Sequence, residues 1–315
     1  MGDNIVKIIV SAAGTGGHIY PALAIIDKFK EKEKDLEVLY IGTHNRMEKD
    51  IVPKRNIPYE SIEIYGFSKT NILRDIKNIF LIIKAKNKCL KIMKKMKPDL
   101  VLGIGGYVTY PVISAAHKLG IKTFIHEQNS IPGKSNLSLQ KKVDLIGVSF
   151  RETEDKFTKA KGKVFYSGNP CGEKAIATPP ISKEKFGLDP KKKLVVIVAG
   201  SLGSSTINNK MVDFLHKAKD ANYEILYITG KNLYDDFVKE NKFSSNVKVV
   251  PYVDGLPALL KNTDLIVTRA GASTMSEILS LNLPAIFIPS PYVANNHQYY
   301  NALTLKNNNA GELIE

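Results

Sequence analysis

Short aliphatic runs alternate with longer amphipathic segments in the first half of the chain. The runs predict β-strands at Lys7–Ser11, Glu37–Ile41, Leu100–Ile104, Lys122–His126 and Asp144–Ser149. Because they are nearly continuous in Val, Ile and Leu, they are typical of strands that are buried on both faces of a parallel sheet. Strands that are separated by helical segments indicate βαβ units, so a doubly wound α/β domain is predicted here.

A second series of the same kind follows a break in the pattern. From Ser167 to Pro190, Gly, Pro and polar residues replace the periodic runs, which predicts a linker. Further strands are expected at Leu194–Ala199, Glu224–Thr229, Val247–Pro251, Asp264–Thr268 and Pro284–Pro289. The predicted domains are residues 1–165 and 166–315. The fold class is therefore α/β, with two Rossmann-like doubly wound domains separated by a cleft that would bind a ligand.

Length and cysteine usage narrow the class of protein. A chain of 315 residues is long enough for two domains of about 150 residues each. Its longest apolar runs fall far short of the roughly 20 residues that a membrane-spanning helix needs, and no basic leader precedes the first of them. Cys89 and Cys171 are far apart and have no Cys or His at metal-ligand spacing, so neither a disulfide scaffold nor a zinc site is indicated. A cytosolic protein is expected.

The formal net charge of +14 favours an anionic partner. The window Lys69–Lys97 holds ten Lys or Arg against the single acid Asp75, and apolar residues recur near helical spacing from Ile72 to Met96. One interpretation is a helix that packs on its domain and exposes a solvated face. The alternative is that Ile72, Leu73, Phe80 and the lysines rest on an anionic inner membrane leaflet. Binding of nucleic acid is disfavoured, because no helix-turn-helix, zinc finger or aromatic RNA platform accompanies the charge.

A glycine-rich turn, Gly14-Thr15-Gly16-Gly17-His18, follows the first strand and precedes a helix that Pro21 is expected to open. Glycines there let backbone N–H groups approach an anion or a sugar closely, although a purely structural turn has the same pattern. His18 is a candidate general base for a hydroxyl nucleophile, and the alternative is a helix-capping role.

Polar residues also end later strands. His126-Glu127-Gln128-Asn129 follows a first-half strand, where it either binds a ligand or only terminates the strand. In the second half, Ser201 and its glycine loop are candidates for binding a diphosphate, and Glu277 for accepting hydrogen bonds from ribose hydroxyls or for complementing a helix dipole. Gln298 offers a donor and an acceptor to sugar hydroxyls, and a surface side chain is the alternative. No Asp-x-Asp pair or acidic cluster indicates a divalent cation, so metal independence is expected.

Seven motifs occur in a family-like order: Gly14-Thr15-Gly16-Gly17-His18 with Tyr20-Pro21-Ala22, Gly103-Ile104-Gly105-Gly106-Tyr107 with Pro111, His126-Glu127-Gln128-Asn129, Gly168-Asn169-Pro170, Gly200-Ser201-Leu202-Gly203, Arg269-Ala270-Gly271-Ala272 with Glu277, and His297-Gln298 with Asn301-Ala302. On these motifs, which span nearly the whole chain, it resembles the peptidoglycan N-acetylglucosaminyltransferases. These act on lipid I, undecaprenyl-pyrophosphoryl-N-acetylmuramyl-pentapeptide.

The resemblance implies a GT-B fold and an inverting transfer of N-acetylglucosamine from UDP-N-acetylglucosamine to the 4-hydroxyl of lipid I, which gives lipid II. It implies a peripheral enzyme at the cytoplasmic face of the cell membrane, with a lipid-binding N-terminal domain. The site residues that it implies are His18 as the base with Glu127 in support, and Thr15, Gly16, Gly17, Asn129, Ser201, Val253, Glu277 and Gln298 as substrate-binding residues. No cofactor is implied.

Two features depart from the family pattern. Cys171-Gly172 stands where the family usually has Arg shortly after Gly-Asn-Pro, and Gly311–Glu315 reads as a strand without the closing helix of the family. Three alternatives remain open at this level: a glycolipid synthase, a UDP-N-acetylglucosamine 2-epimerase of similar fold, and a non-enzymatic basic adaptor.

Overall fold

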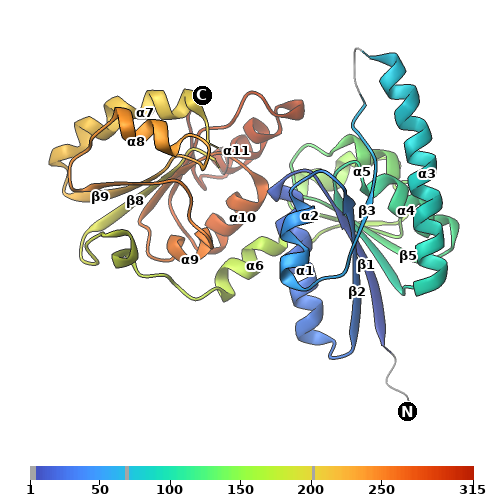
Figure 1. The fold of residues 1–315 in the computed structure, drawn as a ribbon. Helices are drawn as coiled ribbons and strands as arrows, with labels where there is room; N and C mark the ends of the chain where they lie inside the picture. Colours follow the sequence, from blue (N-terminus) through green and yellow to red (C-terminus); the bar gives the residue numbers. More distant parts are fainter. Residues whose placement is uncertain (1–4, 68–70, 201–202) are drawn as a thin grey trace. The chain divides into compact units, whose positions relative to one another are not determined.

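The computed structural model describes residues 5–67, 71–200 and 203–315. The chain divides into two compact units, Met1–Pro170 and Cys171–Glu315. The boundary between the units lies within the segment that the sequence predicts as a linker. Each unit is built around its own parallel sheet, and helices lie on both sides of each sheet (Figure 1).

Unit 1 contains a seven-stranded parallel sheet in the order β3-β2-β1-β4-β5-β6-β7, as far as the described residues show. Its strands are β1 Val6–Ala12, β2 Leu36–Thr43, β3 Tyr59–Ile62, β4 Leu100–Gly105, β5 Lys122–Glu127, β6 Leu145–Val148 and β7 Lys163–Tyr166. Its helices are α1 Gly16–Lys32, α2 Glu48–Ile51, α3 Ile72–Met96, α4 Thr109–Lys118 and α5 Lys134–Leu139. The direction of winding reverses between β1 and β4, so the chain leaves these two neighbouring strands toward opposite faces of the sheet.

Unit 2 repeats this plan with the strand order β10-β9-β8-β11-β12-β13 in its described part. Its strands are β8 Lys193–Val198, β9 Tyr223–Ile228, β10 Val247–Val250, β11 Leu265–Thr268, β12 Ala285–Phe287 and β13 Glu312–Leu313. Its helices are α7 Ser205–Lys217, α8 Tyr234–Glu240, α9 Leu256–Leu260, α10 Ala272–Ser280 and α11 His297–Asn307, and α6 Pro170–Ala177 begins at the unit boundary. Here the winding reverses between β8 and β11.

Alternation along β1 explains why helices cover both faces of the first sheet. Ile8 and Val10 face the cluster that α1 closes, whereas Ile9 between them faces the cluster under α3 and α4. All three side chains are fully buried. Burying an aliphatic side chain of this size contributes about 1.5–3 kcal/mol, so both helical layers are stabilised by the same strand. The same division recurs in unit 2, where Val196 and Ile197 face opposite clusters.

The structure differs from the sequence-based expectations at three places. Helix α1 begins at Gly16, so Pro21 lies inside the helix and does not open it. The short strands β3 and β7 were not predicted. The segment predicted as a linker contains helix α6, and Gly172 of this helix packs against α10.

Candidate active site

In unit 1, polar and glycine-rich loops meet at the carboxyl ends of β1 and β4, where the winding reverses. Ligands of doubly wound sheets bind at this kind of position. Gly14 has φ +101, a backbone conformation that favours glycine. Gly17 lies in the first turn of α1, has no positive φ, and a Cβ there would meet only the Thr15 hydroxyl at 3.7 Å. Neither backbone conformation nor packing therefore requires glycine at position 17, and its Cα surface is open to a ligand.

The His18 side chain is fixed by the same loop. Its Nδ1 lies 3.1 Å from the carbonyl oxygen of Ala13. Because a carbonyl only accepts hydrogen bonds, Nδ1 carries the proton in the neutral ring, and the lone pair is on Nε2. Thr15 is the N-cap residue of α1, so the ring stands at a helix N-terminus. The tautomer is the one that a general base acting through Nε2 requires.

The loop after β4 packs directly on the loop after β1. The Ala13 N–H donates to the Gly105 carbonyl at 3.2 Å. A Cβ on Gly105 would lie 2.8 Å from His18 Nε2, and one on Gly106 would lie 2.6 Å from the Ala13 oxygen. Gly105 and Gly106 therefore belong to the site, although the sequence indicated them only as part of a family motif. Their signal was the glycine pair directly after a predicted strand.

Glu127 is buried and fully engaged in its own loop. Its carboxylate accepts hydrogen bonds from the Asn129 N–H at 3.0 Å, the Gly133 N–H at 2.9 Å and Asn136 Nδ2 at 2.8 Å. Asn129 Nδ2 also approaches it at 3.3 Å. With these four donors, Glu127 shapes the loop between β5 and α5 and places Asn129 at the sheet edge.

His126 and Gln128 form a buried polar network beneath that loop. His126 Nε2 lies 2.9 Å from the Gly168 carbonyl oxygen, and its Nδ1 lies 3.0 Å from Gln128 Nε2. Gln128 Nε2 also donates to the Ile104 carbonyl at 2.8 Å, which ties the end of β5 to the end of β4. Burial lowers the pKa of His126, so the ring is neutral near pH 7. Its role in the structure is to hold loops together.

In unit 2 the corresponding position lies between β8 and β11. Gly271 is the N-cap of α10, with φ −73, and a Cβ on it would meet no atom within 4 Å, so nothing in the described part of the protein requires glycine there. Glu277 lies on the same helix. Burial raises the pKa of the Glu277 carboxyl to about 8. A partly buried carboxyl on the helix that begins at this glycine is suited to accept hydrogen bonds from ligand hydroxyls.

The remaining predicted residues of unit 2 follow neighbouring strands. Gln298, near the start of α11, accepts a hydrogen bond from the Ser290 N–H at 2.8 Å through Oε1, which directs its amide nitrogen to other partners. Asn301 Nδ2 donates to the Ala270 carbonyl at 3.3 Å and braces the loop before α10. Val253 is buried in the loop after β10. Ser201 lies outside the described residues.

Gly172 explains one departure from the family pattern. A Cβ there would lie 2.7 Å from Ser276 Oγ and would collide with Ser280 Oγ, so α6 and α10 touch at this glycine. A larger side chain at this position would displace the two serine hydroxyls and crowd the Ser276 carbonyl at 3.2 Å. Burial raises the pKa of the neighbouring Cys171 thiol to about 12, so this cysteine is a neutral packing group.

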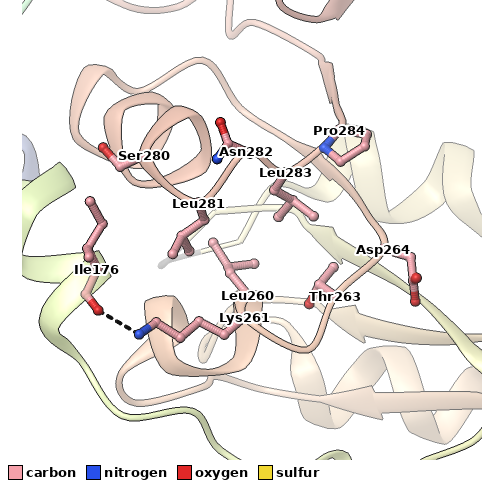
Figure 2. A pocket seen from close by; sticks show the side chains of 10 residues that line it. All are labelled: Ile176, Leu260, Lys261, Thr263, Asp264, Ser280, Leu281, Asn282, Leu283 and Pro284. Carbon is pink, nitrogen blue, oxygen red and sulfur yellow. Dashed lines mark hydrogen bonds between the residues drawn. The ribbon is translucent and has the colours of Figure 1, made fainter.

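An open hollow of about 580 Å³ lies at the amino ends of the strands β11 and β12 in the second sheet (Figure 2). The turns before β11 and β12 line it, and Lys261 Nζ donates across it to the Ile176 carbonyl at 2.6 Å. Because Glu277 and Gln298 belong to loops and helices after these strands, the hollow is separate from the candidate nucleotide site.

The part of the chain that the structure describes contains neither a candidate metal site nor a candidate membrane-spanning helix. Residues 5–67, 71–200 and 203–315 contain no group of three or more His, Cys, Asp or Glu side chains that could hold a metal ion. In the same ranges, no helix has both the length and the apolar character that are needed to cross a bilayer.

Known proteins define the class to which this architecture belongs. A crystal structure of Acinetobacter baumannii MurG matches with a TM-score of 0.76 and 28% identity, over 98% of this chain and 86% of that chain. The chain is also 43% identical, over 98% of its length and 85% of the relative, to a Bacillus pumilus protein. That protein is named UDP-N-acetylglucosamine--N-acetylmuramyl-(pentapeptide) pyrophosphoryl-undecaprenol N-acetylglucosamine transferase. A relative of the same name from an Exiguobacterium species is 41% identical over 98% of the chain and 86% of its own length.

Two parallel α/β units that each contain a reversal of winding, together with these matches, define a glycosyltransferase of the GT-B type. The glycosyltransferase family 28 N-terminal domain matches residues 8–148, and the family 28 C-terminal domain matches residues 194–315. The chain belongs to glycosyltransferase family 28. It is a hexosyltransferase.

Proposed function

We propose that this enzyme transfers N-acetylglucosamine from UDP-N-acetylglucosamine to the 4-hydroxyl of lipid I, with inversion at the anomeric carbon, to give lipid II for peptidoglycan synthesis. The curated relatives at 41–43% identity carry the name of this transferase. The observation in the structure that supports it best is the contact of His18 Nδ1 with the Ala13 carbonyl, which leaves the lone pair of the neutral ring on Nε2. Inversion by direct displacement needs one general base and no covalent enzyme intermediate.

On the acceptor side, His18 Nε2 takes the proton of the 4-hydroxyl as that oxygen attacks the anomeric carbon. Asn129 contacts the sugar or the acceptor, and Glu127 supports it through its hydrogen bonds to the Asn129 backbone and side chain. In this proposal Glu127 is a positioning residue. Thr15, Gly16 and Gly17 approach the donor sugar and diphosphate, since the Cα of Gly17 is open to a ligand.

On the donor side, Glu277 accepts hydrogen bonds from the ribose hydroxyls. The amide nitrogen of Gln298 donates to a sugar hydroxyl, because its oxygen is engaged with Ser290. Val253 contacts uracil through its backbone, and Ser201 meets a phosphate. The open Cα surface of Gly271 supports close approach of the nucleotide to the start of α10.

The reaction needs no metal in this proposal, because helix N-termini and loop amides stabilise the diphosphate leaving group. The measurement is the rate of UDP release in excess EDTA. An unchanged rate is expected, and a loss of activity that Mg²⁺ restores would contradict metal independence.

The enzyme acts at the anionic inner surface of the membrane through α3. Six apolar residues of this helix are exposed: Ile72, Leu73, Ile76, Ile79, Phe80 and Ile83. At about 100° per residue they fall on one face, and the buried Ala85 and Cys89 point away from that face. The first turns of α3 extend beyond the other elements of unit 1 (Figure 1). An exposed apolar stripe flanked by lysines is the pattern of an interfacial helix.

The deciding experiment incubates the protein with UDP-N-acetylglucosamine, with and without a soluble lipid I analogue, and identifies products by mass spectrometry. UDP release that depends on the acceptor, together with a β-1,4-linked disaccharide, is expected. Turnover without acceptor would favour the epimerase alternative, and transfer to diacylglycerol in place of the analogue would favour a glycolipid synthase.

A further inference from the structure

The peptide group between Ala13 and Gly14 is held at both ends. Its carbonyl oxygen, on Ala13, accepts the hydrogen bond from His18 Nδ1 at 3.1 Å. Its N–H, on Gly14, donates to Glu48 Oε2 at 3.3 Å. One peptide therefore lies between a carboxylate and the imidazole that serves as the base in the proposed function.

Glu48 is fully buried at the start of α2. Both of its carboxylate oxygens accept hydrogen bonds, Oε2 from Gly14 and Oε1 from Thr43. Its Oε1 accepts hydrogen bonds from the Thr43 N–H at 3.0 Å and from the Thr43 hydroxyl. The three donors around the carboxylate are neutral. Among the described residues the charge is stabilised by these hydrogen bonds and pairs with no basic side chain, so its field acts on the adjoining peptide.

Two tyrosines enclose the carboxylate and hold the same loops. Tyr40 and Tyr59 stack with ring centroids 5.9 Å apart. The Tyr40 hydroxyl donates to the Ala12 carbonyl at 2.9 Å, and the Tyr59 hydroxyl donates to the Thr43 carbonyl. Burial, and then the charge of Glu48, raise the pKa of both phenols, so both stay neutral at pH 7.

The other charged groups near Glu48 point to solvent. Arg46, Lys49 and Asp50, on the preceding loop and on α2, are exposed and screened by water. Glu48 is thus the buried charge closest to the Ala13–Gly14 peptide among the described contacts.

We propose that Glu48 is a positioning residue of the transferase that acts on His18 through the Ala13–Gly14 peptide. The carboxylate polarises the Gly14 N–H, and this increases the negative charge on the Ala13 oxygen and strengthens its hydrogen bond to His18 Nδ1. The consequences are a fixed Nδ1–H tautomer and a more stable imidazolium after His18 has taken the acceptor proton. A carboxylate that contacts histidine directly has the same two effects in a catalytic triad.

The catalytic part of this inference rests on the proposed function. The effect of Glu48 on the tautomer and titration of His18 is measured without substrate. The probe is ¹⁵N NMR of histidine-labelled full-length protein across a pH titration, with the His18→Ala spectrum to assign the His18 signals. The neutral wild-type ring is expected to carry its proton on Nδ1. In Glu48→Gln the His18 titration midpoint is expected to fall by about half a pH unit or more, because a buried negative charge is lost.

Tyr40→Phe is the matched control. It removes a buried hydrogen bond to the neighbouring Ala12 carbonyl but keeps the Glu48 charge, so the His18 midpoint is expected to stay unchanged. A folded Glu48→Gln protein with the wild-type midpoint would overturn the inference. If that variant does not fold, the wild-type spectrum still decides, since a proton on Nε2 of the neutral ring overturns it as well.

Activity adds a separate test. With UDP-N-acetylglucosamine and a lipid I analogue, Glu48→Gln should lower kcat about tenfold or more and move the acidic limb of its pH profile to lower pH. A lower kcat with an unmoved limb would show a purely structural role. Absence of transfer by the wild-type protein would contradict the proposed function and leave the NMR result standing.

Discussion

The imidazole of His18 lies directly on the Cα of Gly105, where a Cβ would come within 2.8 Å of Nε2. Gly105 also has φ +117, a backbone conformation that favours glycine. Both this conformation and the position of the His18 ring therefore require that residue 105 has no side chain. This contact joins the loops after β1 and β4 at the reversal of winding. The contact therefore fixes the position of the His18 imidazole, the candidate base on α1.

Replacing Gly105 by Ala is expected to displace the His18 ring and to lower kcat by at least about tenfold. Gly120→Ala is the matched control, because Gly120 has φ +69 but no atom within 4 Å of a Cβ. It introduces similar backbone strain away from the site.

His18→Ala should lower kcat by roughly 10²–10⁴-fold, the usual contribution of a general base. Undiminished turnover of His18→Ala would contradict the role of His18.

Alanine at Gly17 or Gly271 is expected to raise KM for UDP-N-acetylglucosamine while changing the melting temperature by only about 2–4 °C. At both positions φ is ordinary, and a methyl group meets at most the Thr15 hydroxyl, at 3.7 Å from Gly17. The open surface therefore matters only to a ligand. Thermal unfolding and initial rates on the same protein separate the two effects, and an unchanged KM would show that the donor does not approach these glycines.

The pH dependence of nucleotide binding follows from Glu277, whose pKa is raised to about 8 by burial. Ribose hydroxyls donate to the ionised carboxylate, so binding below pH 8 must release a proton. UDP affinity should therefore rise with pH, at most tenfold per unit, and level off above about pH 8. Calorimetry in buffers of different ionisation enthalpy measures the released proton. Glu277→Gln should show no such proton release.

The contribution of Glu277 to the free energy of unfolding has the opposite dependence on pH: it falls as the pH rises. The folded-state pKa of Glu277 lies above its ordinary value of 4.5, so its contribution is fully present below pH 4.5 and is lost as the pH rises toward 8. The loss is at most about 1.4 kcal/mol per pH unit. Glu277→Gln should be more stable than wild type at pH 8 and equally stable at pH 4, as measured by urea unfolding.

Gly172→Ala is expected to lower the free energy of unfolding by about 1–3 kcal/mol, because the methyl group collides with Ser280 and crowds Ser276. Gly271→Ala serves as the control, with no predicted collision. Equal stability of the two variants would show that α6 and α10 do not touch as described.

Charge reversal on α3 tests the membrane proposal. Lys77→Glu with Lys84→Glu should weaken binding to phosphatidylglycerol vesicles, because each lysine near the surface contributes about 1 kcal/mol. Lys88 is left intact, since it pairs with Glu60 at 2.7 Å. Lys210→Glu with Lys217→Glu on α7 makes the same change of charge elsewhere. Equal effects of the two pairs in a flotation assay would remove α3 as the binding face.

Much of the fold was readable from the sequence because the signal is local. Runs such as Leu100–Ile104 are apolar on both faces, and that pattern alone identifies a central parallel strand. The strands β3 and β7 escaped because they lie at sheet edges and are only partly buried, so their sequences are mixed. The glycine loops and His18 could also be named as candidates from the sequence, since glycine after a strand is a local signal.

The sequence by itself determined the alternation of strands and helices, the two units and the residues able to do chemistry. Only the tertiary structure decided which of those residues work together. Glu48 belongs to none of the motifs, yet it contacts Gly14 across 34 positions of sequence. Gly172 likewise gives no sign of its contact with α10. Such relationships arise when parallel strands bring distant loops to one edge of a sheet, and no spacing along the chain encodes them.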